Sequence, residues 1–164
     1  MELYFLRHGI AGEQKRASST EDAERTLTPE GIEQIKKVAK CMKEMKLSLK
    51  AVISSPFVRA RQTAEIAAKT VGFSGEIILS EALIPDAGFD GFFELLKKQG
   101  SKGNLLFVGH IPSLANFVST LISRGGASVD FKKGGLCRVD TLDADLSIPS
   151  ELKWLVTPEL LTRL

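Results

Sequence analysis

Short apolar runs alternate along the chain with longer stretches in which apolar residues recur every three or four positions. An unbroken apolar run of a few residues, such as Leu3 to Leu6, is typical of a strand that is covered on both faces, as in a parallel sheet. The runs predict strands over residues 3–6, 51–53, 77–79 and 105–108, and two later strands over residues 135–142 and 152–157.

The helical stretches have recognisable starts and ends. Thr28 can cap a helix, Pro29 suits its first position, and Glu30 complements the positive end of the helix dipole. Apolar residues then recur at helical spacing from Ile32 to Met45, with lysines and glutamates between them. Similar spacing predicts helices from residues 55–56 to about residue 72, over residues 89–99, and over residues 112–123.

The alternation of strands and helices predicts an α/β fold, a three-layer sandwich with a mainly parallel central sheet flanked by helices. The 164 residues show no internal repeat, no low-complexity tract and no linker, so we expect a single domain over residues 1–164. Residues 11–27 are polar and charged, and we expect them to form a long surface loop. Long loops within compact domains are often functional.

Composition narrows the class of protein. Apolar residues make up 43% of the chain and charged residues 26%, as in ordinary globular domains. The net charge of +2 argues against a nucleic-acid-binding protein, and no apolar segment approaches the length that crosses a bilayer. The four apolar residues before Arg7 are too few for a signal peptide, so we expect a cytoplasmic protein. Cys41 and Cys137 lack metal-type spacing and are expected to be reduced, buried or half-buried thiols.

The candidate chemistry lies where predicted strands end. In open α/β sheets, ligands bind beyond the carboxyl ends of the strands. The first strand is followed by Arg7, His8 and Gly9, and the fourth by Gly109 and His110. The chain contains only these two histidines. Two scarce residues at equivalent places in the topology are difficult to explain by packing alone.

The second strand brings basic side chains to the same edge. Ser54 and Ser55 follow it, with Arg59 and Arg61 near the start of the next helix. Residues two apart cannot share one helix face, so at most one of these arginines is expected to point into a site. Histidines and arginines gathered at one edge would form a cationic cup, to which N–H groups at nearby helix starts add donors. Because the arginine fork matches phosphoryl oxygens, the pattern favours a phosphoryl ligand.

Other uses of these residues are less well supported. A metal site would need more ligands on the same edge, no H-E-x-x-H pattern occurs, and the arginines would repel a cation. A serine nucleophile at Ser54 or Ser55 would lack the G-x-S-x-G elbow, and these serines suit a helix cap better. A cysteine phosphatase does not fit, because Cys41 lies within a predicted helix and Cys137 within a predicted strand.

Three motifs carry a resemblance to a known family: LRHG at residues 6–9, SSPFVRARQT at 54–63 and VGH at 108–110. In order and spacing the chain resembles the histidine phosphatase superfamily, which shares its fold with cofactor-dependent phosphoglycerate mutase. The short chain, LTPEG at 27–31 and LIP at 83–85 are similar to the SixA branch, the protein phosphohistidine phosphatases. The resemblance extends to about residue 142.

The resemblance implies roles for four residues. His8 would be the nucleophile that attacks phosphorus and becomes a phosphohistidine. Arg7 and Arg59 would hold the phosphoryl oxygens, and His110 would bind the same group and stabilise charge in the in-line transition state. No metal or other cofactor is implied, because the arginines supply the electrostatic stabilisation.

The carboxylates are less regular. Ile10 stands where the SixA pattern commonly has an aspartate. Phosphomonoesterases of the superfamily also use a carboxyl group to protonate the leaving alkoxide. Glu13, Glu81 and Asp86 are the candidates, and for each a solvated surface carboxylate is the better-supported interpretation. Without such an acid, substrates with good leaving groups, such as phosphohistidine, would be favoured.

The resemblance therefore predicts a phosphohistidine phosphatase that acts on a phosphorylated protein of the phosphotransfer or histidine-kinase type. Separately, we expect a monomer. One alternative is a small-molecule phosphomonoesterase of the same superfamily. Another is a non-catalytic module that binds phosphorylated partners, although binding alone would not require a nucleophilic imidazole. We expect neither nucleic acid nor a membrane as a partner.

Overall fold

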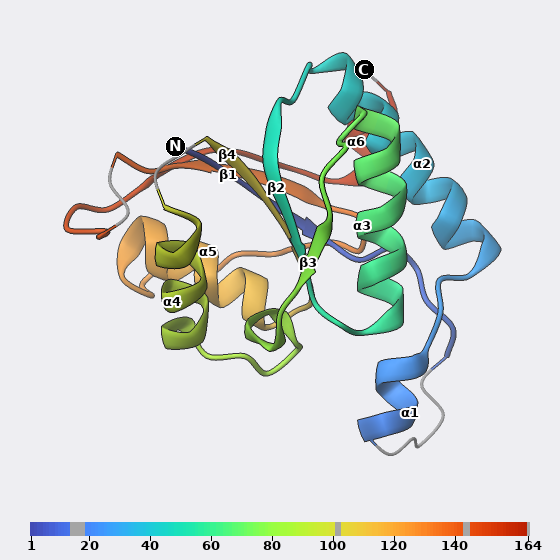
Figure 1. Cartoon of the computed structure of the whole chain (residues 1–164), viewed down its shortest axis with the longest axis horizontal. Helices are drawn as coiled ribbons and strands as arrows, with labels where there is room; N and C mark the ends of the chain where they lie inside the picture. The colour runs from blue at the N-terminus through green and yellow to red at the C-terminus, as the bar shows by residue number, and fades with distance from the viewer. Residues whose placement is uncertain (14–18, 101–102, 143–144, 164) are drawn as a thin grey trace.

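The computed structural model describes residues 1–13, 19–100, 103–142 and 145–163 (Figure 1). Within these residues, six strands form one sheet in the order β3-β2-β4-β1-β5-β6. The strands are β1 (Glu2–Arg7), β2 (Leu49–Ser54), β3 (Ile77–Leu79), β4 (Asn104–Gly109), β5 (Leu136–Asp140) and β6 (Glu151–Val156).

The first four strands in sequence are mutually parallel, and β5 and β6 complete the sheet in antiparallel pairs. Strand β1 lies between β4 and β5, and its apolar run from Leu3 to Leu6 is buried, as a central strand requires. The mainly parallel sheet and the α/β class predicted from the sequence are confirmed, with each predicted strand present to within two residues at either end.

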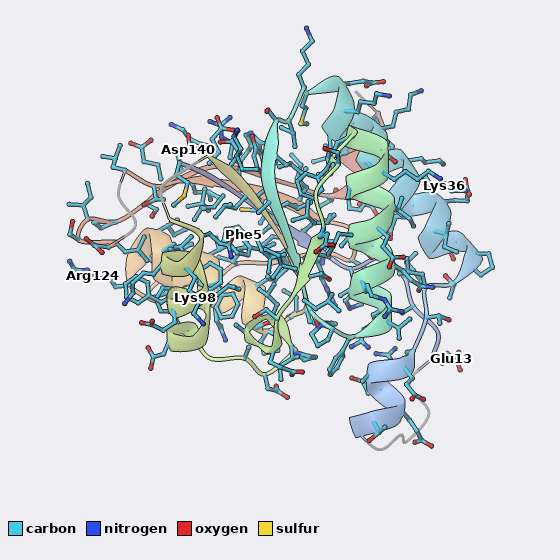
Figure 2. All side chains as sticks on the ribbon, in the orientation of Figure 1. Phe5, Glu13, Lys36, Lys98, Arg124 and Asp140 are labelled. Carbon is cyan, nitrogen blue, oxygen red and sulfur yellow. The ribbon has the colours of Figure 1, made fainter. Side chains whose placement is uncertain are left out.

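Helices cover both faces of this sheet (Figure 1). One core packs α4 and α5 against one face, and includes the aromatic cluster of Phe5, Phe92, Phe107 and Phe117. The other packs α2, α3 and α6 against the opposite face. Figure 2 shows Phe5 in the interior, whereas Lys36 points outward from α2. The helices are α1 (Ser19–Glu24), α2 (Pro29–Glu44), α3 (Val58–Val71), α4 (Phe89–Gln99), α5 (Ser113–Ser123) and α6 (Pro158–Leu161), with a 3₁₀ turn, η1, at Glu81–Leu83.

The start of α2 is interlocked with the loop that follows β1. Thr28 caps the helix as predicted, because its Oγ1 accepts the N–H of Gly31 at 3.0 Å. The N–H of Thr28 in turn donates to the carbonyl of Ile10 at 3.0 Å. Gly31 packs so closely that a Cβ at this position would lie 1.9 Å from that same carbonyl oxygen. The first turn of α2 therefore fixes the chain two residues beyond His8.

The expectation of a loop throughout residues 11–27 is wrong in part. Residues 14–18 lie outside the described residues, but α1 occupies Ser19–Glu24. Leu27 is buried and its main chain pairs with that of Ala11. The segment has no apolar stripe that would predict a helix. It is held by polar contacts to distant residues, which leave no periodic signal.

Other features agree with the sequence or extend it. Cys41 is half-buried, Cys137 is buried, and both are free thiols, as expected. Helix α6 was not predicted; Thr157 caps it and Pro158 begins it. Among the described residues, no helix combines the length and the apolar character that crossing a membrane requires.

Candidate active site

The sheet register brings three strand ends together. Arg7 at the end of β1 pairs with Gly109 of β4, and Ser54 of β2 pairs with Val108 on the other side of β4. The residue that follows β1 and the residue that follows β2 both stay bonded to β4. The N–H of His8 donates to the Gly109 carbonyl at 3.0 Å, and the N–H of Ser55 donates to the Val108 carbonyl at 2.9 Å. The loops after β1, β2 and β4 thus leave the sheet side by side, as the argument from strand ends expected.

A cavity of about 560 Å³ opens at this edge. Arg7, His8, Arg59 and His110 all line it, so the structure brings the four predicted site residues together. Further charged residues on its wall are the cations Arg25 and Lys133 and the carboxylates Glu13, Asp22 and Asp86.

His8 is held as a neutral imidazole with a defined tautomer. His8 is only 6% exposed, and its Nδ1 lies 2.7 Å from the Gly9 carbonyl oxygen. Because a carbonyl can only accept, Nδ1 carries the proton and Nε2 keeps its lone pair. The Nε–H of Arg59 donates to this Nε2 at 3.3 Å. Burial, assisted by the charges of Arg59 and Arg7, lowers the pKa of His8 to about 3 despite the bond to Gly9.

His110 faces His8, with 5.0 Å between the ring centroids. Its Nε2 lies 2.9 Å from Ser55 Oγ, which already accepts the main-chain N–H of Phe57 at 3.2 Å. When the serine hydroxyl donates its hydrogen to Nε2, the ring proton of His110 lies on Nδ1. Burial, followed by the neighbouring His8 and arginine charges, lowers the pKa of His110 to about 2.

Arg59 is the better placed of the two candidate arginines of α3. It is 3% exposed, and Nη1 donates to the Asp22 carbonyl at 2.7 Å while Nη2 contacts Asp22 Oδ2 at 3.3 Å. Its guanidinium carbon lies 5.2 Å from the centroid of the Phe57 ring. Arg61 instead lies on the exposed face and pairs with Glu65. Only one of the two arginines enters the site, as the helix geometry required.

Arg7 approaches the cavity from the end of β1. Its Nη1 donates to the Phe131 carbonyl at 2.6 Å. Burial lowers the pKa of Arg7, and likewise that of Arg59, but a guanidinium keeps its charge in proteins. Arg7 Nε and His110 Nδ1 are both buried without a hydrogen-bond partner among the described residues. Unsatisfied buried polar atoms are costly, and both residues line the cavity.

The site also contains residues that the sequence did not single out. Asp22 and Arg25 come from the segment around α1, and Lys133 from the loop before β5. The assignment of Ser54 and Ser55 as a helix cap is wrong, since Phe57 is the N-cap of α3 and makes no side-chain capping bond. Ser55 is instead committed to His110, which explains its burial.

The structure separates the three carboxylates considered as proton donors. Glu13 and Asp86 are exposed and line the cavity, and Figure 2 places Glu13 next to α1. Glu81 is exposed at the start of η1 and is not on the cavity wall. Ile10 lines a different cavity, beside α2 and α6. Among the described residues, no group of three or more His, Cys, Asp or Glu side chains could hold a metal ion.

The sequence matches the family described as histidine phosphatase superfamily (branch 1) over residues 3–85. The chain belongs to the histidine phosphatase superfamily. The match covers β1, β2, β3 and the helices between them, which carry three of the four predicted site residues: Arg7, His8 and Arg59. The resemblance to this family read from the sequence motifs is therefore confirmed.

Individual relatives extend the comparison over the rest of the chain. An uncharacterised protein of Picosynechococcus sp. (strain PCC 7002) is 33% identical over 168 residues, covering 95% of this chain and 99% of the relative. The phosphohistidine phosphatase SixA of Escherichia coli K12 is 27% identical over 124 residues, 74% of each chain. A solved structure of the protein histidine phosphatase SixA complexed with tungstate superposes with a TM-score of 0.86 at 24% identity, covering 98% of this chain and 99% of that one. Membership of the superfamily supports phosphatase activity for this chain, and the solved SixA structure shows that the fold is shared.

Proposed function

We propose that this protein hydrolyses phosphohistidine on another protein, through a phosphohistidine intermediate at His8. The observation that carries the proposal is the state of His8: a buried, neutral imidazole whose Nδ1 is engaged by Gly9 and whose Nε2 lone pair faces Arg59. A neutral imidazole with Nδ1 fixed as a donor has its lone pair on Nε2, which can attack phosphorus once the N–H of Arg59 turns to the phosphoryl group.

The reaction proceeds by two in-line displacements. In the first, Nε2 of His8 forms a bond to phosphorus while the bond between phosphorus and the substrate imidazole breaks. The departing imidazole keeps the electron pair and takes a proton from solvent. In the second, a water molecule attacks phosphorus, the bond to His8 breaks, and orthophosphate leaves. Through both steps Nδ1 keeps its proton and donates it in a hydrogen bond to the Gly9 carbonyl, and this bond fixes the orientation of the ring.

The remaining three residues stabilise the transferring group. Arg59 lies against His8, and its Nε–H can pass from Nε2 to a phosphoryl oxygen. Arg7 and His110 line the same cavity, and Arg7 Nε and His110 Nδ1 have no hydrogen-bond partner among the described residues. Charge develops mainly on the equatorial oxygens in phosphoryl transfer, so fixed donors of this kind are the principal catalytic contribution.

The choice of a phosphohistidine substrate rests on leaving-group chemistry and on the relatives. Imidazole departs more easily than an alkoxide, so it needs less assistance from a general acid. The carboxylates on the cavity wall, Glu13 and Asp86, are exposed rather than held in an apolar environment that would keep them protonated. The E. coli relative is named a phosphohistidine phosphatase, and the similar solved structure binds tungstate, an oxyanion.

A small-molecule phosphomonoesterase is the second candidate. Asp86 and Glu13 reach the cavity, and either could protonate an alkoxide if a substrate held it close. A parallel assay separates the two functions: release of phosphate from a phosphohistidine protein and from a panel of sugar, nucleotide and amino-acid phosphates. We expect kcat/KM for the phosphohistidine protein to be larger. Faster turnover of one small ester would favour the second function instead.

A signalling or phosphotransfer protein as the substrate, a monomeric state and a cytoplasmic location stay predictions of the sequence. The first is tested by the same assay with intact phosphorylated domains in place of a free phosphohistidine peptide. Activity lost on the peptide and kept on the domain would indicate that the protein surface around the phosphohistidine is recognised.

A further inference from the structure

We infer that Asp22 is a positioning residue that sets Arg59 against the nucleophile. This inference rests on the proposed function, because it concerns the reaction at His8. Asp22 belongs to α1, a short polar helix that extends from the rest of the molecule in Figure 1. The sequence alone gave this residue no role.

Three oxygens of Asp22 bind two arginines of the cavity wall, Arg59 and Arg25. Its main-chain carbonyl accepts from Arg59 Nη1 at 2.7 Å, and its Oδ2 pairs with Arg59 Nη2 at 3.3 Å. Its Oδ1 accepts from Arg25 Nε at 2.8 Å. Arg25 is fixed at its other end, since its Nη1 donates to the Gly12 carbonyl at 2.6 Å. The carboxylate is therefore the bridge between two guanidinium groups.

The orientation of Arg59 depends on these contacts. A guanidinium is planar, so fixing Nη1 and Nη2 on one side also fixes the direction of its Nε–H. That N–H is the one that meets Nε2 of His8 at 3.3 Å. The side chains of Arg59, Asp22 and Arg25 are 3%, 17% and 20% exposed, so this chain of contacts lies in a partly desolvated place where charged hydrogen bonds are strong.

The electrostatics agree with a structural rather than a chemical role for the carboxylate. Partial burial would raise the pKa of Asp22, but the hydrogen bond from Arg25 and the charges of Arg59 and Arg25 outweigh it and lower the pKa. Asp22 is thus ionised at neutral pH and cannot donate a proton to a leaving group. Its negative charge also repels a phosphate dianion, so any contribution of Asp22 to the rate must come from the placement of Arg59.

The experiment compares Asp22→Ala and Asp22→Asn with Glu24→Gln. Glu24 is an exposed residue of the same helix that does not line the cavity, and its substitution removes the same charge as Asp22→Asn. We expect Asp22→Ala to lower kcat about 10- to 100-fold. Orthophosphate, used as the competitive inhibitor, should bind to within about threefold of its wild-type affinity. The loss of the Asp22 carboxylate removes a charge that repels the anion, and this gain offsets the less well oriented guanidinium of Arg59. Asp22→Asn should recover part of kcat, since the amide oxygen can still accept, and Glu24→Gln should behave as wild type.

A spectroscopic readout makes the test independent of turnover. The ¹⁵N resonance of His8 Nε2 reports the hydrogen bond from Arg59, and it should move in Asp22→Ala and stay in place in Glu24→Gln. If wild type hydrolyses no phosphorylated substrate, the proposed function fails while this resonance still tests the positioning. If wild type is active and Asp22→Ala has the kcat and the resonance of Glu24→Gln, the positioning role is wrong. Loss of kcat and of orthophosphate affinity together would also overturn it, because that pattern indicates collapse of the site.

Discussion

The Nε–H of Arg59 meets the Nε2 lone pair of His8 at 3.3 Å, with both side chains buried. The cation thus lies against the atom proposed to attack phosphorus. A phosphoryl group that enters the cavity must accept this N–H in place of Nε2. The arginine and the nucleophile therefore contact the same ligand from adjacent positions.

Arg59→Lys should lower kcat/KM by about 10²- to 10³-fold, because an ammonium cannot present the planar fork that reaches His8 and the phosphoryl oxygens together. Steady-state kinetics with a phosphohistidine protein measures the effect. Arg61→Lys is the matched control, two residues along the same helix, exposed and paired with Glu65. The two variants should differ by at least tenfold, and similar rates would show that Arg59 does not act on the substrate.

The two buried imidazoles should make the protein less stable in mild acid. The pKa of His8 is about 3 and that of His110 about 2 in the folded state, against about 6.5 in an unfolded chain. Between these values the unfolded state binds more protons, so stability is complete above pH 6.5 and is lost as the pH falls below it. We expect the free energy of unfolding in urea to drop by about 2 kcal/mol per imidazole from pH 7 to pH 5.

The variants His8→Gln and His110→Gln isolate this contribution, because each removes one titrating ring. Each should show a smaller drop between pH 7 and pH 5 than the wild type. The carboxylates with lowered pKa, such as Asp22 and Asp140, lose their contribution at lower pH and do not interfere in this interval. An equal drop in all three proteins would mean that the imidazoles are not buried in the neutral form.

Gly31→Ala should destabilise the fold and slow the enzyme, although alanine normally favours a helix. The new Cβ would lie 1.9 Å from the Ile10 carbonyl oxygen, so the loop after His8 must shift. We expect a loss of about 1–3 kcal/mol in the free energy of unfolding, with reduced kcat. Gly91 is the matched control because it occupies the same third position in α4, where a Cβ would meet only Ala82 Cβ at 3.8 Å. Gly91→Ala should be neutral or stabilising by about 0.5–1 kcal/mol, without an effect on kcat.

Hydrolysis should depend steeply on the leaving group. If Glu13 and Asp86 supply no proton, aryl phosphates with acidic phenols should react much faster than alkyl phosphates in the same cavity. Asp86→Asn should then leave the rate on p-nitrophenyl phosphate within about twofold, as should Glu81→Gln, whose carboxylate lies off the cavity wall. A rate that is flat across leaving groups, and falls tenfold or more for alkyl phosphates in Asp86→Asn, would identify Asp86 as the acid.

The sequence was sufficient for the sheet and for the residues at its edge. Apolar runs predict strands because burial on both faces requires them, and residues that follow parallel strands must meet at one edge, as Arg7, His8 and His110 do. The amphipathic spacing and caps likewise predicted α2 and α4. Helical periodicity predicted that at most one of Arg59 and Arg61 enters the site, and the family resemblance assigned Arg59.

What escaped prediction is held by polar contacts between distant residues. Asp22 and Arg59 are 37 positions apart, and Ser55 and His110 are 55 apart. A carboxylate in a polar segment has no feature that distinguishes a site residue from a solvated one. A short polar helix such as α1 is stabilised by its neighbours and not by its own sequence pattern, so only the fold reveals it.

The most direct test of the account is the site of phosphorylation in a trapped intermediate. Wild-type protein mixed with a ³²P-labelled phosphohistidine protein and quenched in alkali within milliseconds should carry one acid-labile, alkali-stable phosphate on the peptide that contains His8. The His8→Ala variant should carry none and release no phosphate. Turnover by His8→Ala, or label on any other residue during turnover, would contradict the proposal that Nε2 of His8 attacks phosphorus.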